Sequence, residues 1–98
     1  MTVGATAVRS VRLRITGRVQ GVGFRAWAVR QASALGLRGW VRNRLDGSVE
    51  AHATGQAEDV AAFIEACRGG PLGARVANVA IDEAEDDRSL GFSAVSTR

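Results

Sequence analysis

The chain changes from one hydrophobic period to another across nine residues that include three glycines, GRVQGVGFR, residues 17–25. Before this run, Val11, Leu13 and Ile15 alternate with polar residues, which predicts a half-buried β-strand. After it, residues 24–35 are rich in alanine and place apolar side chains at helical spacing. Glycine permits the positive φ angles that a tight reversal needs. The sequence therefore predicts a strand, a glycine-rich loop and a helix in immediate succession.

This loop has the chemistry of a phosphate-binding site. Successive main-chain N–H groups that point inward form a nest for anions, and a helix N-terminus adds partial positive charge. Arg25 supplies a planar guanidinium group that matches phosphate. The run lacks the Lys-Ser/Thr pair of a P-loop and the GxGxxG spacing of a dinucleotide site, and a glycine-rich turn that binds nothing is the alternative. The predicted phosphate-binding residues are Gln20, Gly21, Val22, Gly23, Phe24 and Arg25.

The remaining residues continue the alternation of strands and helices. Asp46-Gly47 is a strong hairpin signal between two strand-like segments, and the glycines around Pro71 end a second helix. The expected elements are strands at 11–16, 37–45, 48–54 and 76–83, helices at 24–35 and 58–67, and a short edge strand at 91–97. Two interleaved β-α-β units in this order form an antiparallel sheet with both helices on one face. We therefore predict an α+β fold, the ferredoxin-like plait βαββαβ, with the other face of the sheet open.

Composition limits the classes of protein that this chain can represent. Its 98 residues suit one small domain, and 46% apolar residues are enough for one core. We predict a flexible N-terminal extension at residues 1–8 and a folded domain at residues 9–98. One cysteine and one histidine exclude an internal disulfide and a Cys/His zinc site, and no apolar leader or membrane span is visible. These features predict a cytoplasmic protein without membrane association.

The basic residues are thirteen arginines and no lysine, and the net charge is +3. The excess is small and scattered, and residues 83–87 are acidic. We interpret this balance either as weak steering of a small anionic substrate or as having no functional role.

Asn43 is the second candidate for chemistry. Asparagine is disfavoured inside a strand, its carboxamide both accepts and donates hydrogen bonds, and the plait places it near the mouth of the glycine loop. Alternatively, Asn43 only begins the hairpin turn. Other conspicuous residues are expected to have structural roles: His52 as a solvated side chain, Cys67 in helix packing, and Val79 and Ile81 in the core.

Two motifs resemble those of the acylphosphatase family. One is Gly17-x-Val19-Gln20-Gly21-Val22-x-Phe24-Arg25, and the other is Gly39-Trp40-Val41-Arg42-Asn43-x-x-x-Gly47-x-Val49, followed by Gly55. The resemblance extends over residues 12–95, nearly the whole chain. It implies the same plait and a small cytosolic monomer that hydrolyses acyl phosphates to a carboxylate and orthophosphate.

By motif position, the resemblance implies that Arg25 and Asn43 are the catalytic residues. Arg25 would bind the phosphoryl oxygens, the amides of residues 20–25 would hold the remaining oxygens, and Asn43 would orient the attacking water. No metal or cofactor is implied, and phosphate or sulfate is expected to bind as a product-like ligand. The segment 92–98 lacks the aromatic ending common in relatives, which concerns only the packing of an edge strand.

Two other functions fit parts of the sequence. A plait that binds RNA carries aromatic residues on its central strands, but the strands at 11–16 and 48–54 have none and tyrosine is absent. An acylphosphatase-like domain excised from a larger enzyme would look identical in sequence. We expect a small acyl phosphate as the ligand, and neither nucleic acid nor a membrane as a partner.

Overall fold

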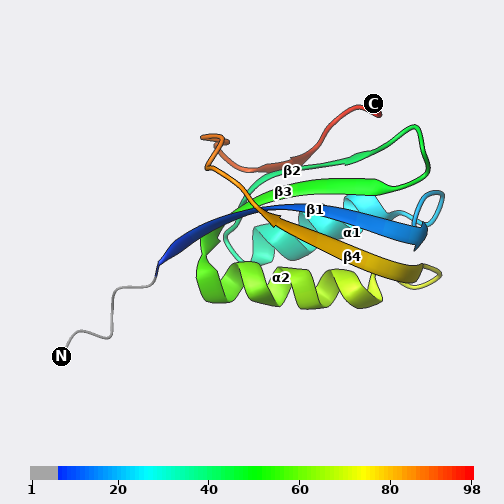
Figure 1. Ribbon diagram of the computed structural model, residues 1–98, viewed down its shortest axis with the longest axis horizontal. Coiled ribbons are helices and arrows are strands. Elements are labelled where there is room, and N and C mark those ends of the chain that lie inside the picture. Colours follow the sequence, from blue (N-terminus) through cyan, green and yellow to red (C-terminus); the bar gives the residue numbers. More distant parts are fainter. Residues whose placement is uncertain (1–6) are drawn as a thin grey trace.

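The computed structural model describes residues 7–98, which form one sheet and two helices (Figure 1). The elements follow the order β1 (Val8–Arg18), α1 (Phe24–Ala34), β2 (Arg38–Asn43), β3 (Val49–Gln56), α2 (Ala57–Gly69), β4 (Arg75–Glu83) and β5 (Phe92–Ala94). Every expected strand and helix is present, with bounds that differ by a few residues. Most of the predicted extension, residues 1–8, lies outside the described residues, and Val8 is already the first residue of β1.

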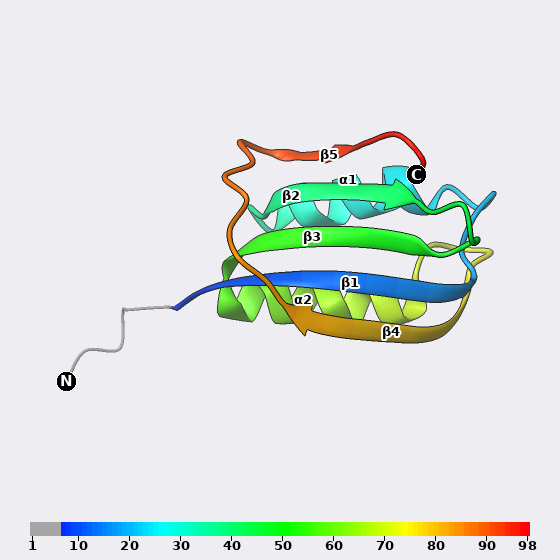
Figure 2. The same cartoon turned by 45° about the horizontal axis from the view of Figure 1, so that its top comes forward.

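The strand order in the sheet is β4-β1-β3-β2-β5, which Figure 2 shows face-on. β1 pairs antiparallel with β3 and β4, and β2 pairs antiparallel with β3. These four strands and the two helices form the predicted βαββαβ plait. β5 is a parallel edge strand beside β2, with Ala94 opposite Val41, so the complete sheet is mixed.

The hydrophobic core lies between the sheet and the two helices, which cover the same face (Figure 2). Val11, Leu13 and Ile15 are fully buried there, as their alternation predicts. The helices contribute Phe24, Ala28 and Ala32 from α1, and Val60, Phe63, Ile64 and Cys67 from α2. Val79 is buried, but Ile81 is 37% exposed, so the prediction of a core position for Ile81 is wrong. Ile81 lies on β4, an edge strand with a neighbouring strand on one side only.

The opposite face of the sheet is covered by its own polar side chains rather than open. Glu50 on β3 forms ion pairs with Arg12, Arg42 and Arg44 at 3.1, 2.9 and 3.3 Å. Burial raises the pKa of Glu50, but the hydrogen bond from Arg42 and the nearby guanidinium charges outweigh it and hold this pKa below its usual value. Glu50 is therefore ionised and paired at neutral pH.

His52 lies on the same covered face, and the prediction that it is solvated is wrong. Only 2% of its surface is exposed. The ring stacks on Trp40 with centroids 5.9 Å apart, and Nε2 lies 2.9 Å from the carbonyl oxygen of Glu85. The guanidinium groups of Arg12 and Arg42 lie over the Trp40 ring, at 5.1 and 4.8 Å from its centroid. Along β3, His52 points away from the core, which is why the alternation predicted a solvated side chain. Neighbouring side chains and the segment between β4 and β5 bury it instead.

Helix α2 contributes a cysteine to the core, and neither helix meets the requirements for spanning a membrane. Cys67 is buried, as predicted, and burial raises the pKa of its thiol to about 12. The thiol is therefore protonated at neutral pH and is not activated as a nucleophile. Within residues 7–98, no helix combines the length and the apolarity needed to cross a bilayer.

Candidate active site

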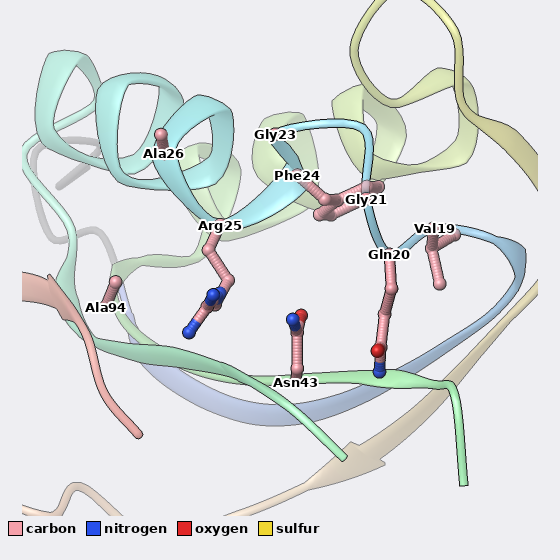
Figure 3. A pocket seen from close by; sticks show the side chains of 9 residues that line it. All are labelled: Val19, Gln20, Gly21, Gly23, Phe24, Arg25, Ala26, Asn43 and Ala94. Atoms are coloured by element: carbon pink, nitrogen blue, oxygen red, sulfur yellow. The ribbon is translucent and has the colours of Figure 1, made fainter. Parts of the chain in front are cut away.

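The glycine-rich loop spans residues 19–23 and connects β1 to α1 (Figure 3). Gly21 and Gly23 have φ angles of 75° and 77°, in the left-handed region that residues with side chains disfavour. A Cβ atom on either glycine would meet no atom within 4 Å, so this side of the loop faces open space. The conformation and the space together suit a ligand that approaches the main chain closely.

The main-chain N–H groups of this loop are free to bind an anion. Among the described residues, no protein acceptor takes a hydrogen bond from the N–H groups of residues 20–26. The first helical bond of α1 runs from Trp27 N to Gly23 O at 3.1 Å, and the first turn of this helix has no acidic side chain. The first turn of α2, by contrast, contains Glu58 and Asp59. The N-terminus of α1 therefore keeps its donors and its partial positive charge available.

Arg25 lies in the first turn of α1, and its side chain extends into the cavity below the loop (Figure 3). Its hydrogen bond to the protein is long, 3.5 Å from Nη1 to the carbonyl oxygen of Val95. Ion pairs within residues 7–98 occupy Arg9, Arg12, Arg14, Arg38, Arg42, Arg44 and Arg68, but not Arg25. The guanidinium group of Arg25 is therefore available to an anionic ligand.

Asn43 is the last residue of β2. Strand side chains alternate, so Asn43 shares the helix-covered side of the sheet with the buried Val41. Its side chain projects beyond the core, lies between Arg25 and Gln20, and points toward the loop (Figure 3). The strand thus presents a carboxamide opposite the free N–H groups, as the plait topology predicts.

A cavity of about 480 Å³ brings these groups together. It is lined by Val19, Gln20, Gly21, Gly23, Phe24, Arg25, Ala26, Asn43 and Ala94. Of the residues predicted for the site, only Val22 is missing from this lining, because its side chain packs against the core. The sequence did not identify Val19, Ala26 or Ala94 as lining residues. Ala94 comes from β5, which pairs parallel with β2. A pairing between segments so far apart in the chain cannot be predicted from a local sequence pattern.

The end of the molecule that holds the cavity is basic. The connections at this end (residues 18–25, 43–48 and 69–75) carry Arg18, Arg25, Arg44 and Arg75 and one acidic residue, Asp46. Hydrogen bonds from the side chain and main chain of Ser48 hold the pKa of Asp46 below its usual value. Within the part of the chain that the structure describes, no three His, Cys, Asp or Glu side chains are grouped as metal ligands. The site is therefore built from hydrogen-bond donors and one positive side chain.

Known proteins resemble this chain in sequence and in fold. The family model for acylphosphatase matches residues 11–94. The chain is 53% identical over 83 residues to an acylphosphatase of Rhodopseudomonas palustris (strain BisB5), covering 85% of this chain and 82% of the relative. Its fold matches the crystal structure of acylphosphatase from Bacillus subtilis with a TM-score of 0.86 at 36% identity, covering 91% of this chain and 99% of the other.

A second solved structure places the same fold inside a larger protein. HypF from T. kodakarensis matches with a TM-score of 0.80 at 32% identity, over 90% of this chain but 12% of HypF. The relatives of similar length, in contrast, are matched over most of their own chains. On the extent of the family match and the identity to these relatives, the chain belongs to the acylphosphatase family.

Proposed function

We propose that this acylphosphatase hydrolyses the carboxyl–phosphate bond of small acyl phosphates and does so in the cavity below the β1–α1 loop. One observation carries the assignment of the site. The N–H groups of residues 20–26 have no protein acceptor among the described residues, Arg25 has a single long hydrogen bond, and most of these residues line one cavity together with Asn43. A phosphoryl group is a compact anion with several oxygens, and such a set of donors is complementary to it.

In this mechanism, the loop and Arg25 hold the phosphoryl group. The N–H groups of residues 20–25 donate to its oxygens, and the Arg25 fork donates two further hydrogen bonds. In this proposal the donors are held around the cavity before the substrate binds, so they stabilise the charge of the transition state without rearranging. The N-terminal dipole of α1 acts in the same direction.

Asn43 orients the attacking water by accepting a hydrogen bond from it through Oδ1. The water oxygen bonds to phosphorus as the bond from phosphorus to the acyl oxygen breaks, and the bonding electrons leave with the carboxylate. A carboxylate is a good leaving group and needs no proton. The proton of the water passes to an oxygen of the transferred phosphoryl group, so no protein base takes part. Positioning and charge stabilisation are most of what phosphoryl transfer requires.

We further propose that the enzyme acts as a cytoplasmic monomer without a metal ion or cofactor. The thiol of Cys67 is buried and free, which fits a reducing compartment. Phosphate and sulfate resemble the transferred group, and we expect both to bind below the loop.

Binding of RNA finds little support on the sheet. RNA-binding plaits stack bases on exposed aromatic side chains of the central strands. β1 and β3 carry no aromatic residue of this kind, and the Trp40 ring on β2 is covered by Arg12 and Arg42. The proposal therefore retains a small molecule as the ligand.

Hydrolysis of benzoyl phosphate in the presence of EDTA tests the proposed function. We expect turnover without added metal, and competitive inhibition by inorganic phosphate and by sulfate. A protein that does not turn over benzoyl phosphate, or that phosphate inhibits without competing with the substrate, would contradict the proposal. A salt-dependent shift of single-stranded RNA without phosphatase activity would support the RNA alternative.

A further inference from the structure

The side chain of Gln20 connects the two segments that form the candidate site. Its Nε2 atom donates hydrogen bonds to the carbonyl oxygens of Arg44 and Ser48, at 2.8 and 2.9 Å. Gln20 belongs to the β1–α1 loop, whereas both acceptors belong to the turn between β2 and β3. Arg44 directly follows Asn43, so the bridge reaches the chain one residue beyond the proposed water-orienting group.

The two acceptors are also the carbonyl groups that close the turn. The N–H of Gly47 donates to Arg44 O at 3.1 Å, and the N–H of Arg44 donates to Ser48 O at 2.8 Å. Gln20 therefore adds a second donor to each carbonyl group, and both hydrogens of its Nε2 are used. This geometry fixes the orientation of the carboxamide, because a reversed amide would place Oε1 against two carbonyl oxygens.

Among the described residues of loop 19–23, only Gln20 has a side chain that is hydrogen-bonded to the turn between β2 and β3. A second link to the turn, the ion pair of Arg14 and Asp46 at 3.2 Å, begins on β1 and joins two side chains that are roughly half exposed, 43% and 58%. Exposed pairs of this kind constrain geometry weakly. The β-ladder pairs Asn43 with Val49 and fixes the strand, and the Gln20 bridge is the main side-chain link between the loop and the turn that follows Asn43.

We propose that Gln20 is a positioning residue, which holds Asn43 at the distance from the phosphate loop that in-line attack requires. This inference rests on the proposed function, because it concerns the same cavity. The Gln20 side chain acts on the turn and not on the phosphoryl group, whose oxygens are held by main-chain N–H groups and Arg25. Loss of the bridge should therefore lower the rate of the chemical step more than the affinity for phosphate.

The chemistry of the bridge predicts how substitutions of Gln20 rank by their effect on the rate. Gln20→Ala removes both donors, and Gln20→Glu replaces them with oxygens that repel the two carbonyl oxygens. Gln20→Lys restores donors on a longer chain, so it should recover part of the lost rate. The matched controls are Gln31→Ala and Gln31→Glu on α1, where the structure shows no hydrogen bond from the side chain within the described residues.

The first experiment measures kcat and KM for benzoyl phosphate and the inhibition constant of inorganic phosphate, well below the melting temperature of each variant. We expect Gln20→Ala to lower kcat about tenfold and Gln20→Glu to lower it further, whereas kcat of Gln20→Lys should lie between those of Gln20→Ala and the parent. The inhibition constant of inorganic phosphate should stay within about twofold of the parental value in all three variants. Both Gln31 variants should match the parent. The inference is overturned if Gln20→Ala keeps the parental kcat, or if weaker binding of inorganic phosphate accounts for the whole loss of activity. Either result leaves the proposed function intact.

A double-mutant cycle separates positioning from general stabilisation of the fold. Because Gln20 acts through Asn43, Gln20→Ala should change kcat by less than about twofold when Asn43→Ala is already present. A merely structural role would lower kcat by the same factor in both backgrounds. Additive effects would therefore contradict the inference.

A readout that does not depend on turnover completes the test. In the phosphate-saturated protein, the side-chain amide resonances of Asn43 should shift or broaden in Gln20→Ala and remain unchanged in Gln31→Ala. An unchanged Asn43 signal in Gln20→Ala overturns the inference, whether or not benzoyl phosphate is hydrolysed. Failure of the parent protein to hydrolyse benzoyl phosphate is instead a failure of the proposed function.

Discussion

The two ends of the sheet are both rich in polar groups, but they use these groups differently. At the end with the β1–α1 loop, main-chain N–H groups and Arg25 have few protein partners among residues 7–98. At the other end, Asp86 forms a two-point ion pair with Arg38, and Asp87 accepts a hydrogen bond from the indole of Trp40. The comparison teaches that dense charge and available charge are different properties. The donors that remain unpaired surround the cavity, and they are the groups to which we propose that the substrate binds.

Replacing one arginine from each end with glutamine should give the largest contrast. Arg25→Gln removes a charge from the cavity, and we expect kcat/KM for benzoyl phosphate to fall about 10²–10³-fold with little change in melting temperature. Arg38→Gln removes an ion pair with an N–O distance of 2.7 Å, so it should lower the melting temperature and preserve kcat/KM. Steady-state kinetics and thermal denaturation of both variants measure the contrast. Equal losses of activity in the two variants would abolish the distinction between the ends.

Asn43→Ala should have the next largest effect and should act on turnover alone. Without the carboxamide, water is no longer held in line, and we expect kcat to fall about 10²-fold. The inhibition constant of phosphate should stay near the parental value, because the loop and Arg25 are intact. Asn78→Ala, the same change at an exposed position on β4, serves as the control and should behave like the parent. Parallel losses of turnover and phosphate affinity would show that Asn43 helps to hold the phosphoryl group instead.

The two ends of the sheet carry opposite charges, so kcat/KM for an anionic substrate should depend on ionic strength. The connections near the cavity are basic, whereas residues 83–87 at the other end include Glu83, Glu85, Asp86 and Asp87. Salt shortens the range of this field from about 30 Å at 0.01 M to about 3 Å at 1 M. We expect kcat/KM to fall up to about tenfold over that range, because the encounter with an anionic substrate loses its steering.

Two substitutions test this dependence on salt. Arg75→Asn removes a charge at the same end of the sheet as the cavity and should flatten the salt dependence. Arg88→Asn makes the same change at the far end, where a φ of 65° suits asparagine, and should leave the dependence unaltered. Identical slopes for both variants would mean that the charge difference between the ends does not steer the substrate.

The smallest expected effect concerns the pH dependence of stability at the far end. The hydrogen bond from Arg38 is the main reason why the pKa of Asp86 falls from 3.8 to about 2. Since this pKa is lower in the folded state, ionised Asp86 stabilises the fold above about pH 4, and the contribution is lost as the pH falls toward 2. Asp86→Asn should therefore have a lower melting temperature than the parent near neutral pH and the same one near pH 2. Its kcat should be parental, and a difference in melting temperature that persists in acid would contradict this role.

Local patterns predicted most of the fold and the centre of the candidate site. The alternation of Val11, Leu13 and Ile15 and the glycine run before Arg25 depend on residues close together in the chain, so a sequence displays them. The burial of His52 and the bridge from Gln20 could not be predicted in the same way. Both side chains bond to main-chain carbonyl groups of distant segments. Every residue has such a carbonyl group, so the residue type at the partner position does not reveal the contact.

The three residues of β5 pair with β2 alone, yet this strand supplies Ala94 to the wall of the cavity. Short edge strands detach at a lower free-energy cost than the rest of a sheet. A ligand that binds only while this wall is in place makes detachment rarer by mass action. Substrate occupancy would in this way shield the C-terminal part of the chain from proteases, and a starved enzyme would be cleaved there sooner than a working one.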